Sequence, residues 1–186
     1  MIQTIKQEYQ KLPEREQKAI YWGLHLVGAE LSKILILLFF FTIFSKVPEF
    51  VFTAATLLPV RTKMGGIHFK TYLGCLSVSI ALFAGAVMLL PTVLPLTQKA
   101  ALLLLIVCMI VNIFTRPVIN PTRPALTEED IIKTRWRIGL FFTVYIIAAY
   151  IFYNHYFLCG TWMIVEQTVQ LLIGRILEFK KGGVLK

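Results

Sequence analysis

Residues 72–94 read YLGCLSVSIALFAGAVMLLPTVL, a run that contains no charged side chain. A helix needs about 20 mostly apolar residues to cross the hydrocarbon core of a bilayer. This stretch therefore predicts a membrane-spanning helix. Similar apolar blocks recur along the chain, so the solvent that this protein folds in is predicted to be lipid.

The composition supports that interpretation. Of the 186 residues, 57% are apolar and 16% are charged, whereas soluble domains carry about 25% charged residues; the mean hydropathy is +0.72. The net charge of +9 fits the basic cytoplasmic side of a membrane protein. We expect no nucleic-acid partner, because the chain has no basic helix or basic surface interleaved with aromatic residues. Three scattered cysteines give no disulfide framework and no metal spacing, so we expect no metal and no cofactor.

Six apolar segments are predicted to be transmembrane or re-entrant helices, which makes the fold class an all-α integral membrane protein. From the N-terminus to the C-terminus, the Lys and Arg counts of the ends and connections run 4, 1, 3, 1, 5, 0 and 4, where Lys99 is counted with the third connection and Arg175 with the C-terminal end although both lie inside a segment. Because basic residues stay inside, this alternation favours six crossings with both termini cytoplasmic. The second segment rises only about 21 Å, so four crossings with re-entrant pieces also fit. The segments are Tyr21–Phe44, Val47–Val60, Tyr72–Leu94, Leu96–Phe114, Ile138–Leu158 and Gly160–Phe179.

Two polar segments complete a single membrane-embedded domain, residues 1–186. In residues 1–19, apolar side chains fall at helical spacing, which predicts either an amphipathic helix lying on the inner leaflet or a solvated extension of the first span. Residues 115–137 are rich in proline and charge and are predicted to form a cytoplasmic loop.

Polar residues inside membrane spans cost free energy, so each one is a candidate functional residue. Glu30 and Lys33 are spaced to pair on one helix face. Glu166 and Gln167 are expected to pair with a basic group on another helix or to face a cavity. Cys108 and Cys159 have no nearby acid–base partner in the sequence, so they are interpreted as small buried apolar residues.

Residues 61–75, RTKMGGIHFKTYLGC, carry the groups that could do chemistry. A cysteine nucleophile needs a base or a cation that favours the thiolate. His68 lies seven residues before Cys75, and Arg61 adds positive potential. On a continuous helix, residues seven apart stand about 10.5 Å apart along the axis. A His68–Cys75 dyad therefore requires the helix to begin after His68 or to distort between the two, and Gly65–Gly66 can supply unusual backbone angles.

The pattern Arg-x3-Gly-Gly-x-His-x6-Cys at the start of a span resembles the accessory gene regulator B family, the membrane cysteine endopeptidases of bacterial quorum sensing. The resemblance implies that Cys75 is the nucleophile and His68 its base. Arg61, Gly65 and Gly66 take supporting or substrate-binding positions. It also implies a multi-pass protein of the bacterial cell membrane, with its active site near the cytoplasmic face. The implied partners are an AgrD-like precursor peptide, the lipid bilayer and a second copy of the chain in a homodimer.

The same resemblance implies a reaction. The enzyme would cut the C-terminal tail from the precursor through an acyl-enzyme thioester, and would promote closure of the peptide into a thiolactone or lactone. The alternative is a small non-enzymatic transporter or peptide exporter, in which Cys75 is inert. No convincing internal repeat supports that alternative. Substitution of Cys75 separates the two, because transport tolerates loss of the thiol and peptide cleavage does not.

Overall fold

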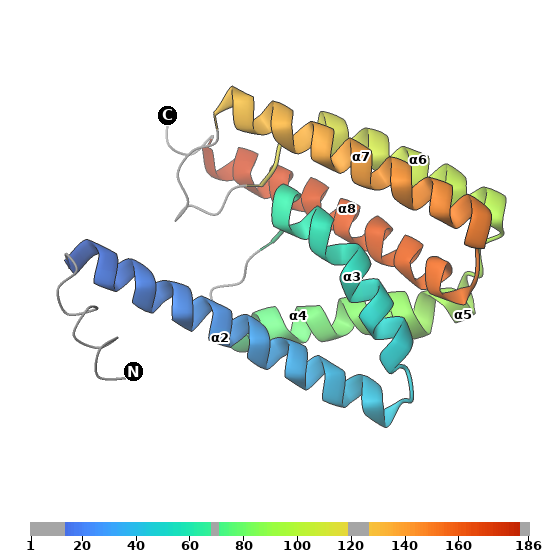
Figure 1. Cartoon of the computed structure of the whole chain (residues 1–186), viewed down its shortest axis with the longest axis horizontal. Helices are drawn as coiled ribbons and strands as arrows, with labels where there is room; N and C mark the ends of the chain where they lie inside the picture. The colour runs from blue at the N-terminus through green and yellow to red at the C-terminus, as the bar shows by residue number, and fades with distance from the viewer. Residues whose placement is uncertain (1–13, 68–70, 119–126, 183–186) are drawn as a thin grey trace. The chain divides into compact units, whose positions relative to one another are not determined.

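The structure is a computed structural model that describes residues 14–67, 71–118 and 127–182. Within those ranges every regular element is helical (Figure 1), which confirms the predicted all-α fold. The chain divides into two compact units, residues 1–44 and residues 45–186.

The described part of the first unit forms one helix, α2 (Glu14–Ile43). It covers nearly all of the predicted first span and starts seven residues before it. From Glu14 onward, the predicted N-terminal segment is therefore continuous with that span; residues 1–13 lie outside the described part of the chain. Glu30 and Lys33 form the ion pair that their spacing predicts.

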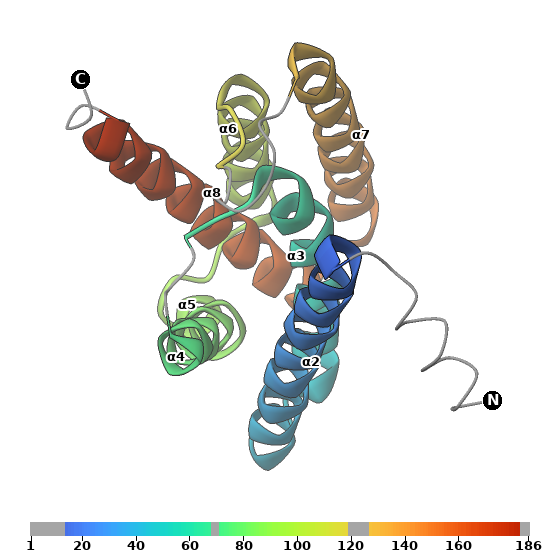
Figure 2. The same cartoon turned by 90° about the vertical axis from the view of Figure 1, so that its left-hand side faces the viewer.

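The second unit is arranged around its last helix, α8 (His155–Gly182), which contacts α3 (Val47–Met64), α6 (Gln98–Phe114) and the π-helical segment η1 (Gly85–Leu89) (Figures 1 and 2). In the most apolar part of α8, 61% of the residues are buried, whereas only 22% are buried in the corresponding part of α7 (Glu128–Phe152). The central helix of this unit is thus the one that carries Glu166 and Gln167. The other described elements of this unit are α4 (Tyr72–Ala84) and α5 (Leu90–Val93).

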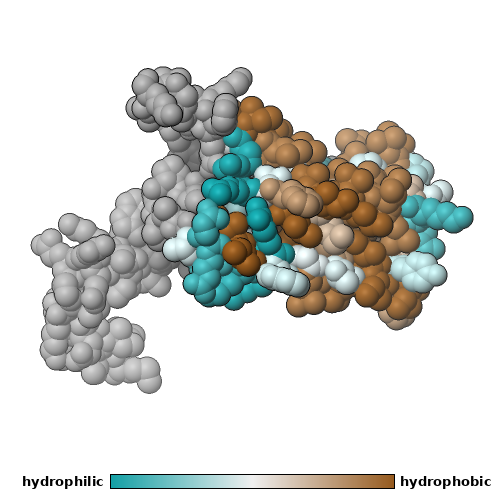
Figure 3. Space-filling view, turned by 90° about the horizontal axis from the view of Figure 1, so that it is seen from above, coloured by the Kyte–Doolittle hydropathy of each residue, from teal (hydrophilic) through white to brown (hydrophobic). Residues whose placement is uncertain are grey.

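Three helical segments of the described chain are long and apolar enough to cross a membrane: Tyr72–Val93, Glu128–Phe152 and His155–Leu177. The face over α6 and α7 is largely hydrophobic in its middle, with a larger group of hydrophilic residues at one end and a smaller group at the other (Figure 3). Large apolar side chains of these two helices are exposed, including Leu103 of α6 and Leu140 of α7. A long apolar helix that leaves its side chains uncovered suits contact with lipid, and the chain is an all-α integral membrane protein.

Two predicted boundaries are wrong, and helix caps explain both. The turn between the last two spans falls at residues 153–154, where Asn154 Oδ1 accepts hydrogen bonds from the backbone N–H groups of Tyr156 and Phe157. The predicted turn, at residue 159, lies inside α8. The predicted loop 115–137 ends at Thr127, because Thr127 and Asp130 form a capping box that starts α7.

Candidate functional site

A small cavity of about 30 Å³ lies between α3, α4 and α8. That volume holds about one water molecule. Arg61 of α3, Cys75 of α4 and Gln170 of α8 all line it, so residues of three different helices share one pocket. The other lining residues are Leu57, Ile67, Val78, Ser79, Leu82, Phe83 and Met163.

Cys75 lies in the first turn of α4, where the helix N-terminus favours negative charge. Thr71 caps this helix: its Oγ1 accepts a hydrogen bond from the Gly74 backbone N–H at 3.2 Å, and its carbonyl accepts one from the Cys75 N–H at 3.1 Å. The helix therefore begins after His68, which is one of the two arrangements that a His68–Cys75 dyad requires. His68 itself lies outside the described residues, so the dyad stays a prediction.

Two glutamines of α8 hold Arg61 by hydrogen bonds. Its Nη1 donates hydrogen bonds to Oε1 of Gln167 at 3.1 Å and to Oε1 of Gln170 at 3.0 Å. The predicted partnership of Gln167 with a basic group on another helix is thus confirmed. Gln170 was not predicted as a functional residue, although the sequence carries a signal for it: two amides spaced i, i+3 in an apolar span share one helix face.

The glycine pair after α3 is required by its surroundings. Gly65 has φ +73°, and a Cβ there would collide with the backbone oxygen of Val118, while the Val118 N–H donates to the Met64 carbonyl at 2.9 Å. A Cβ on Gly66 would lie 2.7 Å from Nη1 of Arg61. Gly65 therefore allows the turn, and Gly66 leaves room for the guanidinium.

Glu166 faces η1 and not the site pocket. A Cβ on Gly85 would lie 2.6 Å from its Oε1, and its buried Oε2 has no hydrogen-bond partner among the described residues. The expectation that Glu166 pairs with a basic group therefore gains no support from the described part of the chain.

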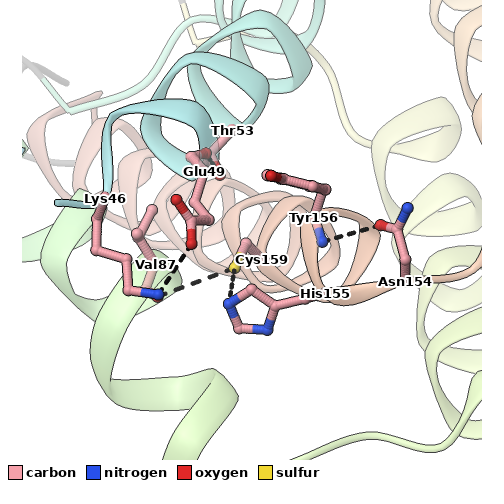
Figure 4. A network of polar contacts seen from close by, with 8 residues as sticks. All are labelled: Lys46, Glu49, Thr53, Val87, Asn154, His155, Tyr156 and Cys159. Atoms are coloured by element: carbon pink, nitrogen blue, oxygen red, sulfur yellow. Dashed lines mark hydrogen bonds and ion pairs between the residues drawn. The ribbon is translucent and has the colours of Figure 1, made fainter.

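A thiol–imidazole contact lies at the N-terminal end of α8, where α3 begins (Figure 4). Cys159 Sγ stands 3.7 Å from His155 Nε2, and Lys46 donates to Glu49 at 2.9 Å beside them. The hydrogen bond with Glu49 raises the pKa of Lys46 above its usual range. The interpretation of Cys159 as lacking an acid–base partner is thus wrong, because His155 is one turn away on the same helix. Cys159 is fully buried, however, which fits its predicted apolar role.

The fold and the pocket define a helical membrane protein with a helix-terminal thiol and a clamped arginine in one cavity. The chain belongs to the accessory gene regulator B family, whose model matches residues 1–171. It is also 28% identical over 121 residues to a protein of Clostridium beijerinckii that is named as AgrB-like. That alignment covers 64% of this chain and 60% of the relative. No solved structure matches the chain.

Proposed function

We propose that the protein is a membrane cysteine endopeptidase that removes the C-terminal tail of an AgrD-like quorum-sensing precursor and promotes cyclisation of the remaining peptide. The observation that carries this proposal is the shared pocket of Cys75 and Arg61 at the start of an apolar helix. Membership of the accessory gene regulator B family supports it.

The proposed reaction begins when His68 takes the proton of the Cys75 thiol. The thiolate adds to the scissile carbonyl carbon, and a tetrahedral oxyanion forms. His68 then returns the proton to the departing amine, so the C–N bond breaks and the tail leaves. The precursor remains bound to Cys75 as a thioester. A cysteine thiol or serine hydroxyl of the precursor next attacks that thioester, which closes the ring and restores the Cys75 thiol. Acyl exchange of this kind needs no ATP, provided that water is kept from the acyl-enzyme.

Arg61 is the proposed oxyanion donor. Backbone amides near Cys75 are the other candidates, but the N–H groups of Gly74 and Cys75 both donate to Thr71. A donor engaged in a helix cap cannot also face a developing oxyanion. A guanidinium supplies charge as well as N–H groups, and one oxyanion donor typically contributes about 10²–10³-fold in rate.

We further propose that residues 1–186 act as one domain in the bacterial cell membrane, as a homodimer, with both termini and the pocket at the cytoplasmic face. The alternating Lys and Arg counts support this orientation. A basic inner surface also complements an acidic precursor tail.

Purified protein in lipid vesicles tests the proposal with a precursor peptide encoded beside its gene. Mass spectrometry follows release of the tail for the wild type, Cys75→Ala, His68→Ala and the matched control Cys108→Ala. The proposal expects release by the wild type and by Cys108→Ala, and none by the other two. Release that survives Cys75→Ala would overturn it. If the wild type releases no tail from any neighbouring precursor, the transporter alternative is favoured.

A further inference from the structure

We infer that Gln167 and Gln170 of α8 are positioning residues that aim the Arg61 guanidinium into the pocket of Cys75. The inference rests on the proposed function and deepens it, because it assigns to the last helix a part in the chemistry of α3 and α4. Neither glutamine belongs to the Arg-x3-Gly-Gly-x-His-x6-Cys pattern.

The first ground is geometry. Arginine has five N–H donors in a rigid planar fork, so fixing one nitrogen of the fork restricts its whole plane. Nη1 is held by two oxygens, at 3.1 Å and 3.0 Å. Gln167 is fully buried and Gln170 is 8% exposed, so both amides act where water competes little.

The second ground is that Gln167 uses both ends of its amide. Its Oε1 accepts from Arg61, and its Nε2 donates to the Gly65 carbonyl at 2.7 Å. One side chain thus holds both the Arg61 guanidinium and the backbone of the turn at Gly65. A glutamate could not do this, because an ionised carboxylate accepts hydrogen bonds but donates none.

The third ground is charge. Amide oxygens orient a guanidinium without neutralising it, whereas a carboxylate at the same place would offset its positive charge. Gln170 meets Arg61 through Oε1, so a glutamate there can keep the hydrogen bond while changing the charge. Gln170→Glu therefore distinguishes a residue that orients Arg61 for the reaction from one that only packs in the structure.

The experiment compares Gln170→Glu, Gln170→Leu and the control Gln98→Leu in the full-length protein in vesicles. Gln98 also makes a hydrogen bond to another helix, since its Nε2 donates to the Tyr150 carbonyl at 2.6 Å, and it lies outside the pocket lining. Four quantities are measured: the kcat of tail release, its KM, the thermal midpoint, and the rate at which iodoacetamide alkylates Cys75.

We expect Gln170→Glu to keep a thermal midpoint at or above that of the wild type while kcat falls about tenfold or more, the size of a partial loss of one oxyanion donor. Alkylation of Cys75 should also slow severalfold, because the pocket becomes less positive. Gln170→Leu should lower kcat as well, and Gln98→Leu should change only the thermal midpoint.

A Gln170→Glu protein with wild-type kcat and wild-type alkylation rate would overturn the inference. Alkylation is independent of the precursor. If the wild type releases no tail but alkylation still slows in Gln170→Glu, the proposed function fails and the assignment of the glutamines to the Cys75 pocket survives.

Discussion

Adding one methyl group at Gly66 directly tests whether the hydrogen bonds of Arg61 to Gln167 and Gln170 matter for catalysis. The new Cβ would lie 2.7 Å from Nη1 of Arg61, whereas an ordinary contact begins at 3.4 Å, so the two atoms must separate by about 0.7 Å. A shift of the guanidinium by that distance breaks or misaligns its hydrogen bonds to Gln170 and Gln167, which measure 3.0 and 3.1 Å. Because Arg61 is a flexible side chain, the backbone need not move.

The expected loss follows from the energy of those bonds. A hydrogen bond to a charged group contributes about 1.5–3 kcal/mol, and every 1.36 kcal/mol in the barrier is about tenfold in rate. If the transition state needs the present orientation of the Arg61 guanidinium, Gly66→Ala should slow tail release by about 10- to 150-fold. Rates are measured in vesicles at saturating precursor, and thermal unfolding is measured on the same samples.

Gly65→Ala is the matched contrast. There φ is +73°, and the collision is with the backbone of Val118, which cannot swing aside. A non-glycine residue in such a conformation costs about 1–3 kcal/mol, so Gly65→Ala should lower the thermal midpoint more than Gly66→Ala does. Gly139→Ala, whose Cβ would meet Ile113 Cδ1 at an ordinary 3.7 Å, should be active and at least as stable as the wild type. A Gly66→Ala protein with the wild-type rate would refute the reasoning.

Three further predictions concern other parts of the chain. Thr127→Ala removes the side chain that caps α7 and should cost about 1 kcal/mol of unfolding free energy, measured by reversible unfolding in detergent; an unchanged value would contradict the capping role. Asn112→Leu removes the buried hydrogen bond of α6 to Thr168 of α8 at 2.9 Å. The same measurement should show a loss of about 0.6 kcal/mol and at most about 1.7 kcal/mol, the mean and the maximum for such bonds inside membranes. Iodoacetamide should alkylate Cys75 before Cys108 and Cys159, since those two are 5% and 0% exposed; peptide mapping that finds Cys159 first would count against the buried position of its thiol.

The apolar blocks predicted most of the helices because the length of a span is set by the bilayer and not by its neighbours. Helix ends were less predictable. Thr127 and Asn154 each act as caps, and a cap is a local contact that outweighs hydropathy near a boundary. The predicted loop and the predicted last turn were misplaced for this reason.

The site was predictable in part. Arg61, Gly65, Gly66 and Cys75 stand close together in the sequence, and their pattern together with the family resemblance singled them out. Gln170 and the contact of Cys159 with His155 depend on which face α8 turns toward its neighbours. In a span that is apolar on most sides, periodicity gives little indication of that face, and only packing reveals it.

Trapping the acyl-enzyme tests the central claim most directly. A precursor whose ring-closing cysteine is replaced by alanine can acylate the enzyme but cannot close the ring, so the thioester should accumulate. Intact-mass spectrometry should then show an added mass equal to the precursor without its tail, mapped to the peptide that contains Cys75 and removed by hydroxylamine. An adduct on Cys108 or Cys159, or tail release by Cys75→Ala, would contradict the account.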